Sequence, residues 1–245
     1  MIKKASSNKV WEIVRRLMFR MFVFLFAFSI VSVILLKWLP VRYTTLMLVR
    51  YIENIENGDY RNIRKWTPID QISENVIFAV IAAEDGRFME HCGIDWEAIK
   101  KARKHNKIYG TRLGASTITQ QTAKNIYLLP SHILSNTALT LLLRKAPEAY
   151  LSFLIELFWS KKRILEVYLN IIEVGDGLYG VETAAQSYFG KSANELSVNE
   201  ASQIASILPN PRKFNIKKPT EELKEKQRKI RTQMLNMKKN GLVIP

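Results

Sequence analysis

The sequence predicts a mostly α-helical domain that follows a single N-terminal transmembrane helix. Three observations support this fold class. Residues 21–36 form a run of 16 residues without a charged side chain. Further along the chain, apolar residues recur mostly at helical spacing, and little alternating strand pattern is present. Glycine and proline are sparse, at 10 and 8 of 245 residues, and no internal repeat interrupts the pattern.

The N-terminal apolar run is long enough to cross a bilayer. A hydrocarbon core of about 30 Å needs about 20 helical residues, which the run reaches if it extends back to Leu17 and the Arg20 side chain bends to the interface. By the positive-inside rule we expect the N-terminus in the cytoplasm and everything after Pro40 on the outer side. The rule rests on six basic residues set against one acid, Glu12: Lys3, Lys4, Lys9, Arg15, Arg16 and Arg20.

The segment that follows the run, "KWLPVRY", has no A-x-A-like cleavage site, so we expect an uncleaved signal anchor. A buried core helix is the alternative, but no polar residue recurs at helical spacing to mark a solvated face. The expected divisions are a cytoplasmic basic tail, the anchor, a membrane-proximal linker, the main domain and a C-terminal basic helix, at residues 1–16, 17–39, 40–65, 66–215 and 216–245.

Charge and cysteine content limit the partners and the kind of site. The net charge of +15 and the pI near 9.9 favour an anionic partner, which could be nucleic acid, a membrane surface or a phosphorylated substrate. The single cysteine, Cys92, excludes an internal disulfide framework and a multi-cysteine zinc site. The three histidines lack H-x-x-x-H spacing, so we expect no histidine-based metal centre at His91, His105 and His132.

The first two helices of the main domain are expected on either side of an acidic turn. A turn at Thr67–Pro68 leads into a helix up to Ala83, although the apolar second half of this segment also fits a buried strand. Asp95 is a helix cap, and the helix that it begins runs to Lys107 with alternating apolar and basic faces.

The later helices follow with few interruptions. We expect a helix over 117–129 and a long apolar pattern over 138–174 that is broken or kinked near Pro147. The remaining expected helices cover 182–189, 198–208 and 221–239, with a turn at 208–214 between the last two.

The acidic turn contains the first candidate for chemistry. The uncharged run "VIFAVIAA" ends directly on Glu84 and Asp85. Partial burial disfavours a charged carboxylate and raises its pKa, and the negative end of a helix dipole acts in the same direction. Glu84 is therefore suited to proton transfer, and Asp85 is expected to orient the turn or pair with a base. Taken alone, two acids that end a helix at the surface explain the pattern equally well.

A second candidate is "YGTRLGASTITQQTAKN", residues 109–125. Thr117 and Gln120 fit a capping box at the start of a helix. Backbone amides at such an N-terminus, together with Gln120 and Lys124 on one helix face, could bind one anionic group. No G-K-[ST] follows, so this is not a P-loop. An ordinary capped helix is the alternative.

The third candidate is "RKAPEAY", which places charges inside an apolar stretch. Arg144 and Glu148 are four residues apart and could form a simple helical ion pair. Alternatively, Glu148 is a second carboxylate kept ionised among Arg144 and Lys145, as in sites that use two carboxylates at a sugar centre. By contrast, residues 160–191 show an apolar stripe with Tyr168 and are expected to be scaffold.

Taken together and in order, these motifs resemble the peptidoglycan glycosyltransferases. The resemblance covers roughly residues 66–215. "EDGRFMEHCG" is similar to the family's E-D-x-x-F-x-x-H-x-G, and "GASTITQQTAKN" to G-x-S-T-x-T-Q-Q-x-x-K-N. Three further stretches are also similar to family motifs: "RKAPE", "KKRILEVYLN" and "GLYGVETAAQSYFGK". The sequence differs little from the pattern, mainly through Cys92 and through Pro147 inside the third motif, which could kink that helix or stand in its first turn.

The resemblance implies a lysozyme-like helical domain on the outer face of the bacterial cytoplasmic membrane. It implies polymerisation of lipid II into β-1,4-linked glycan with release of undecaprenyl diphosphate. Lipid II, the nascent glycan, membrane lipids and other cell-wall synthesis proteins are the implied partners, and nucleic acid is not. The exported part has no S-x-x-K motif, so we expect a monofunctional enzyme without a transpeptidase.

The resemblance also implies roles for particular residues. Glu84 matches the general base that deprotonates the acceptor 4-hydroxyl, and Glu148 matches a second glutamate at the donor's diphosphate end. Some family members respond to divalent cations such as Mg or Mn through the diphosphate, but no certain cofactor follows from the sequence. The implied substrate-binding positions are Asp85, Phe88, His91, Ser116, Thr117, Gln120, Gln121, Lys124, Arg144 and Lys145.

Two other functions remain open at this point. A degradative muramidase or lytic transglycosylase would share the helical layout but shorten existing glycan. A non-enzymatic, membrane-tethered basic protein that binds nucleic acid or anionic lipid would explain the charge. It would not explain the acid pair, the Q-Q-x-x-K helix or Glu148.

Overall fold

A computed structural model describes residues 2–56, 58, 62–110, 113–130, 133 and 137–242. For residues 2–10, 56, 138–139 and 141–142 only the backbone is described, and His132 lies outside the described residues. The chain divides into two compact units, Met1–Leu39 and Pro40–Pro245, which are treated separately below.

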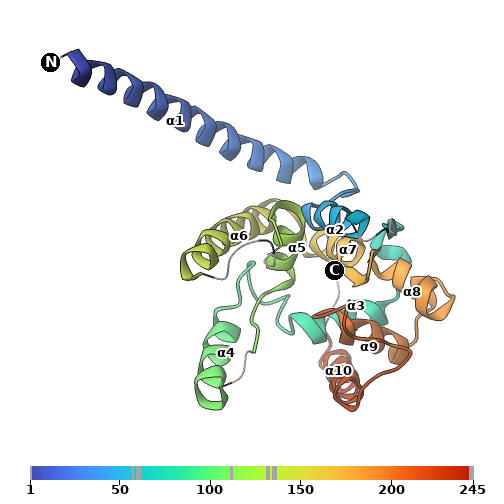
Figure 1. Ribbon diagram of the computed structural model, residues 1–245. Helices are drawn as coiled ribbons and strands as arrows, with labels where there is room; N and C mark the ends of the chain where they lie inside the picture. The colour runs from blue at the N-terminus through green and yellow to red at the C-terminus, as the bar shows by residue number, and fades with distance from the viewer. Residues whose placement is uncertain are drawn as a thin grey trace. The chain divides into compact units, whose positions relative to one another are not determined.

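The first unit is one helix, α1 (Ile2–Leu36) (Figure 1). Its segment Trp11–Leu36 has a mean hydropathy of 2.5 over its most apolar window and is long enough to cross a membrane. Side chains such as Phe22, Phe24 and Phe28 are more than half exposed, an arrangement that lipid would stabilise and water would not. The expected apolar helix is present, and it also includes most of the tail that precedes the expected anchor.

The second unit is predominantly helical (Figure 1). Its elements are α2 (Thr45–Glu56), β1 (Ile63–Arg64), η1 (Ile69–Gln71), α3 (Glu74–Glu84), α4 (Trp96–Tyr109), α5 (Ile118–Tyr127), α6 (Ala138–Phe158), α7 (Lys161–Ile171), β2 (Glu173–Gly175), β3 (Leu178–Tyr179), α8 (Val181–Phe189), η2 (Ala193–Glu195), α9 (Val198–Ile207) and α10 (Glu221–Lys239). In one group of helices α3, α9 and α10 pack against one another, and in another α5 packs against α2, α6 and α7.

The apolar run before the acid pair is a helix and not a strand. Ser73 caps α3, its hydroxyl accepting from the Asn75 N–H at 3.2 Å. All residues from Val76 to Ala82 are buried, and both α9 and α10 pack against α3. A helix buried on all faces has no polar stripe, which explains why its periodicity is weak. Ala83 and Glu84, which precede the acidic turn, are half-buried.

The long apolar segment over residues 138–174 forms two helices that are separated at Trp159 and not at Pro147. The sequence predicts a break or kink near Pro147, or a proline in the first helical turn, but α6 runs through Pro147. Pro147 lacks an N–H for the Leu143 carbonyl, and both residues are exposed, so solvent can satisfy that carbonyl. The chain instead leaves the helix at Trp159, after which the Ser160 hydroxyl caps α7.

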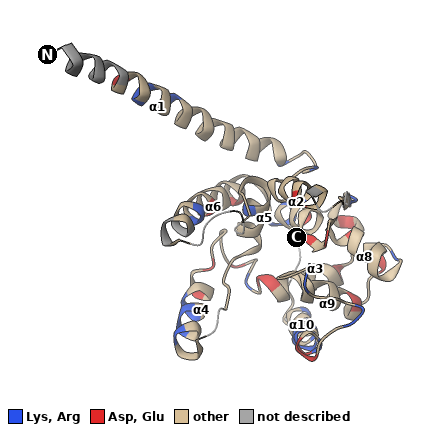
Figure 2. Ribbon diagram, viewed as in Figure 1, with Lys and Arg blue, Asp and Glu red and all other residues tan. Residues whose placement is uncertain are grey.

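Two features of the second unit have no counterpart in the sequence prediction. Residues 40–65, expected as a linker, contain α2, which packs on α5. A three-stranded sheet in the order β1-β3-β2 pairs β1 parallel and β2 antiparallel with β3. Strands of two or three residues are too short to show alternation. Charged side chains lie mainly on outer helices such as α4 and α10 (Figure 2).

Candidate active site

Glu84 ends α3 and points its carboxylate toward α5. The Gln121 side chain donates from Nε2 to Glu84 Oε2 at 2.7 Å. Oε1 is shielded from solvent and has no hydrogen-bond partner among the described residues. Burial raises the pKa of Glu84, while the Gln121 hydrogen bond and the charges of Lys226 and Lys124 oppose the rise. The direction agrees with the sequence prediction, and the desolvation that it named is the largest cause.

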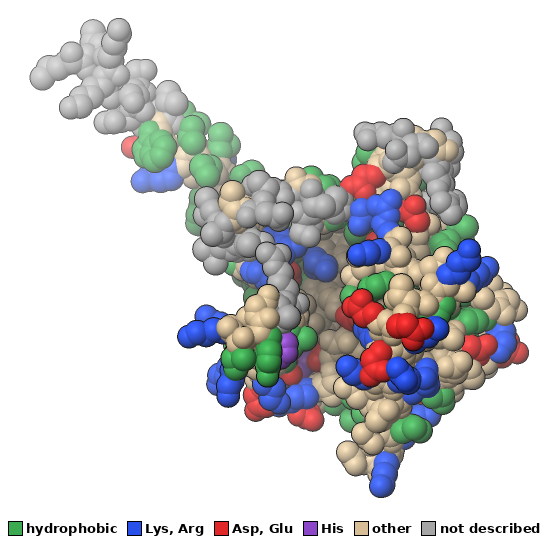
Figure 3. Space-filling view, turned by 60° about the horizontal axis from the view of Figure 1, so that its bottom comes forward, with side chains coloured by type: hydrophobic (Ala, Val, Ile, Leu, Met, Phe, Trp, Pro, Cys, Tyr) green, Lys and Arg blue, Asp and Glu red, His purple; other side chains and the backbone are tan. Residues whose placement is uncertain are grey.

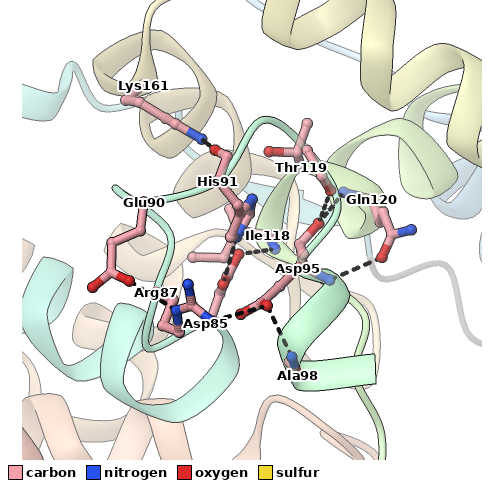
Figure 4. Close-up of polar contacts among 12 residues, drawn as sticks. Asp85, Arg87, Glu90, His91, Asp95, Ala98, Ile118, Thr119, Gln120 and Lys161 are labelled. Atoms are coloured by element: carbon pink, nitrogen blue, oxygen red, sulfur yellow. Dashed lines mark hydrogen bonds and ion pairs between the residues drawn. The ribbon is translucent and has the colours of Figure 1, made fainter. Parts of the chain in front are cut away.

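Asp85 holds the acidic turn against α5 (Figure 4). Its Oδ1 lies 2.9 Å from His91 Nε2, and its Oδ2 accepts from the Ile118 backbone N–H at 3.0 Å. The expected orienting role of Asp85 is therefore visible as a bridge between the turn and the first residue of α5. This bridge fixes where Glu84, the preceding residue, faces.

Phe88 and His91 complete the same turn. Phe88 is fully buried, and its ring meets the His91 ring edge-on at 6.3 Å between centroids. Lys161 at the start of α7 donates to the His91 carbonyl at 2.6 Å, and its ammonium lies 4.4 Å from the Phe88 ring centre (Figure 4 shows the hydrogen bond). The turn is thus held from α5 and α7 at once, which favours a rigid carboxylate at Glu84.

The N-terminus of α5 is capped from within the protein. Thr117 and Gln120 form the predicted capping box, with the Gln120 carbonyl oxygen accepting from the Thr117 N–H at 3.1 Å. Thr117 Oγ1 accepts from the Gln120 N–H, and Asp85 takes the Ile118 N–H. The sequence predicts that these amides and Gln120 converge on an anion. In the structure the two amides and the Gln120 side chain already have partners within the protein, with which an anion would have to compete.

Glu148 lies on α6 beside the same helix. It is 2% exposed, and its Oε1 accepts from Lys145 Nζ at 2.5 Å. The Lys145 ammonium also approaches Ser116 Oγ at 3.4 Å, which links α6 to the segment before α5. Of the two possible ion pairs of Glu148 on its own helix, the structure forms the one with Lys145.

Lys124 lies in the electrostatic field of both glutamates. Burial lowers the pKa of Lys124, Glu148 and Glu84 raise it, and Arg144 and Lys145 lower it further. Lys124 therefore interacts electrostatically with both glutamates and with the cationic segment of α6. The twelve residues predicted from the sequence lie at the end of α3 and in the turn after it, in α5 and the segment before it, and on α6.

Two cavities flank this arrangement. One of about 190 Å³ is lined by Glu84, Asp85, Lys101, Ser116 and Thr117, among others. The other, of about 270 Å³, includes Gln121, Lys124, Arg50, Glu173 and Arg212. Figure 3 shows a deep hollow between two lobes of the surface, with basic side chains near its upper end. One cavity lies at the segment before α5 and the other along α5, so the site has room for two substrates.

Two arginines that line the second cavity were not predicted from the sequence. Arg50 on α2 forms ion pairs with Glu53 at 2.8 Å and with Glu173 at 3.5 Å. Arg212 pairs with Asp176 at 3.0 Å from the turn after α9. They come from segments expected as a linker and as a simple turn, and no local pattern marks them. Their shared cavity arises only from the fold.

One cluster in the described part of the chain has the residue types of a metal site. Potential ligand atoms of Asp85, His91 and Asp95 lie within 4.8 Å of one another. The Asp85 oxygens already contact His91 and the Ile118 N–H, and Asp95 Oδ1 accepts from the Ala98 N–H at 2.8 Å (Figure 4). Arg87 also pairs with Asp95 at 3.5 Å. Asp85 Oδ2 and Asp95 Oδ1 serve as helix caps and Asp95 also pairs with Arg87, so the cluster fits a metal ion poorly.

Comparison with known proteins agrees with this geometry. The family model described as "Transglycosylase" matches residues 50–235. A protein from Bdellovibrio bacteriovorus named "Biosynthetic peptidoglycan transglycosylase" is 44% identical over 221 residues, which cover 90% of this chain and 85% of that protein. Proteins of the same name from Bacteroides thetaiotaomicron and Caulobacter vibrioides are 44% and 41% identical, covering 85% and 95% of this chain and 81% and 96% of their own lengths.

Proposed function

The chain belongs to the transglycosylase family, and we propose that it polymerises lipid II into the glycan strands of peptidoglycan. The observation that carries the proposal is the Glu84 carboxylate with Lys124 in its electrostatic field. Glu84 is half-buried, burial raises its pKa, and its Oε1 has no hydrogen-bond partner among the described residues. Lys124 is a cation whose pKa is raised by both Glu84 and Glu148. A base next to a cationic pocket suits attack by a sugar hydroxyl on a diphosphate-linked sugar.

In the proposed reaction, Glu84 Oε1 takes the proton from the 4-hydroxyl of the acceptor. The oxygen of the acceptor 4-hydroxyl forms a bond to the donor's anomeric carbon, and the bond from that carbon to the diphosphate oxygen breaks. Undecaprenyl diphosphate leaves with the electron pair. Lys124, Arg144 and Lys145 offset the charge that develops on it. Glu148 orders these cations through its contact with Lys145.

A lipid II polymerisation assay tests the proposal. Purified full-length protein in detergent should convert labelled lipid II into long glycan that lysozyme digests. Shortening of preformed glycan without growth from lipid II would instead identify a degradative enzyme. Tight binding of nucleic acid or anionic lipid without either reaction would favour the non-enzymatic alternative.

We place any divalent cation with the substrate and not with a site of the protein. Asp85 Oδ2 and Asp95 Oδ1 already accept from helix N-terminal amides, and Asp85 Oδ1 contacts His91 Nε2, whereas a diphosphate supplies oxygen ligands that Mg or Mn prefers. Chelation with EDTA in the same assay should then slow turnover without lowering the thermal unfolding temperature of the free protein. A lower unfolding temperature on chelation would indicate a protein-held metal instead.

We also propose that the second unit lies outside the cytoplasmic membrane, anchored by α1. The basic residues before the apolar segment of α1 favour this orientation. On α2, Leu48, Ile52 and Ile55 form an exposed apolar stripe suited to a bilayer surface. A C-terminal alkaline phosphatase fusion, which is active only outside the cytoplasm, should be active in a bacterial host. Activity of a C-terminal reporter only in the cytoplasm would rule the orientation out.

A further inference from the structure

Tyr168 is a fully buried tyrosine whose hydroxyl reaches the candidate site. It lies on α7 with 0% exposure, in the apolar stripe that the sequence marks as scaffold. Its hydroxyl donates to Gln121 Oε1 at 3.3 Å. Gln121 in turn donates from Nε2 to Glu84 Oε2 at 2.7 Å. A chain of two hydrogen bonds therefore runs from the core of the unit to the carboxylate.

The direction of these two hydrogen bonds decides which end of the Gln121 amide faces Glu84. A glutamine side chain has one accepting end and one donating end, and rotation of the amide by half a turn exchanges them. Burial raises the pKa of the Tyr168 hydroxyl well above its ordinary value of 10.0, so the group keeps its proton and donates. With Oε1 held by Tyr168, only Nε2 can face Glu84. A rotated Gln121 would place an oxygen against the carboxylate and favour its protonated form.

We propose that Tyr168 is a positioning residue for the reaction, because its hydroxyl fixes the Gln121 amide in the orientation that supports ionised Glu84. The inference rests on the proposed function, in which Glu84 is the base. Tyr168 lines neither of the two cavities described above, so it would act through Gln121.

Other charged groups near Glu84 also shift its pKa. Lys124 on α5 and Lys226 on α10 lower its pKa, and the adjacent Asp85 raises it. Lys226 is held in place by donating to the Ser206 carbonyl at 2.9 Å. These charges remain when the Tyr168 hydroxyl is removed. The Gln121 hydrogen bond, which also lowers the pKa of Glu84, is the contact that the change weakens.

The test compares Tyr168→Phe with Tyr188→Phe in the full-length protein. Tyr188 on α8 donates to the Val174 carbonyl at 2.8 Å, so its variant loses a comparable tyrosine hydrogen bond away from Glu84. For Tyr168→Phe we expect kcat to fall about 10-fold with KM for lipid II unchanged. The acid limb of its pH–rate profile should move to higher pH. Tyr188→Phe should keep the wild-type profile.

A double variant shows whether Tyr168 acts through Gln121. If it does, adding Tyr168→Phe to Gln121→Ala should cause no further loss of kcat, because the amide that Tyr168 orients is already gone. Additive losses, or a Tyr168→Phe profile that coincides with that of Tyr188→Phe, would overturn the inference. Failure of the wild-type protein to extend lipid II would instead refute the proposed function, so the two failures are distinguishable. Thermal unfolding of each variant verifies that it is folded.

Discussion

Replacing Glu84 with Gln is expected to abolish glycan polymerisation, with a loss of about 10³-fold or more in kcat. The amide has nearly the shape of the carboxylate but cannot take a proton from the acceptor hydroxyl. It also changes the contact with Gln121, since two amides now meet where a carboxylate accepted from Nε2 at 2.7 Å. Initial rates of lipid II consumption in wild type and variant measure the effect.

Glu90→Gln is the matched control for this change. Glu90 lies in the same acidic turn, but its side chain is 62% exposed and pairs with Arg87 at 2.8 Å. An exposed pair of this kind contributes little to stability. We expect the control to retain wild-type activity. Polymerisation by Glu84→Gln at the rate of the control would exclude Glu84 as the base.

The raised pKa of Glu84 also fixes the sign of the pH dependence. The base form is the ionised one, and burial lifts its pKa above the ordinary value of 4.5. Activity of the wild-type protein should therefore fall as the pH drops through this raised value and be fully present above it. Glu84→Gln has no such group and should show no acid limb in its residual activity.

Much of the site could be predicted because its parts leave local signatures. The capping box of Thr117 and Gln120 depends on spacing alone, and the structure contains it. The raised pKa of Glu84 follows from an apolar run that ends on an acid, since a buried helix leaves the carboxylate that ends it partly desolvated. Asp95 is likewise a cap visible in the sequence, accepting from Ala98 at 2.8 Å.

Other parts depend on contacts between distant segments and leave no local trace. Tyr168 looks like any core residue of α7 until α5 places Gln121 beside it. Lys226, on the expected C-terminal basic helix, acts on Glu84 only because α10 packs on α3. Asp85 accepts from the Ile118 amide that the sequence predicts to be open for an anion. The helix does not break at Pro147, because the cost of an internal proline depends on exposure, which a sequence pattern does not report.

Glu148→Gln should cause a loss of kcat of about 10²-fold in a protein that still folds. The carboxylate is 2% exposed and accepts from Lys145 at 2.5 Å, and a glutamine oxygen can still accept from that ammonium. The expected cost in stability is therefore small, about 1 kcal/mol. What the amide cannot replace is the negative charge among three cations.

Glu166→Gln is the matched control, because Glu166 accepts from Arg163 at 3.0 Å with the same three-residue spacing on α7. Its variant should unfold at a temperature close to that of Glu148→Gln and keep near-normal turnover. Turnover by Glu148→Gln at the rate of this control would remove Glu148 from the mechanism.

The lost charge of Glu148 should also appear in the alkaline limb of the pH–rate profile. Glu148 raises the pKa of Lys124, whereas burial, Arg144 and Lys145 lower it. In Glu148→Gln the pKa of Lys124 therefore falls further, and Lys124 loses its proton at a lower pH than in the wild type. If a protonated Lys124 offsets the charge of the departing diphosphate, the alkaline limb must move to lower pH. An equal loss of kcat at every pH would mean that Glu148 acts on the donor directly and not through Lys124.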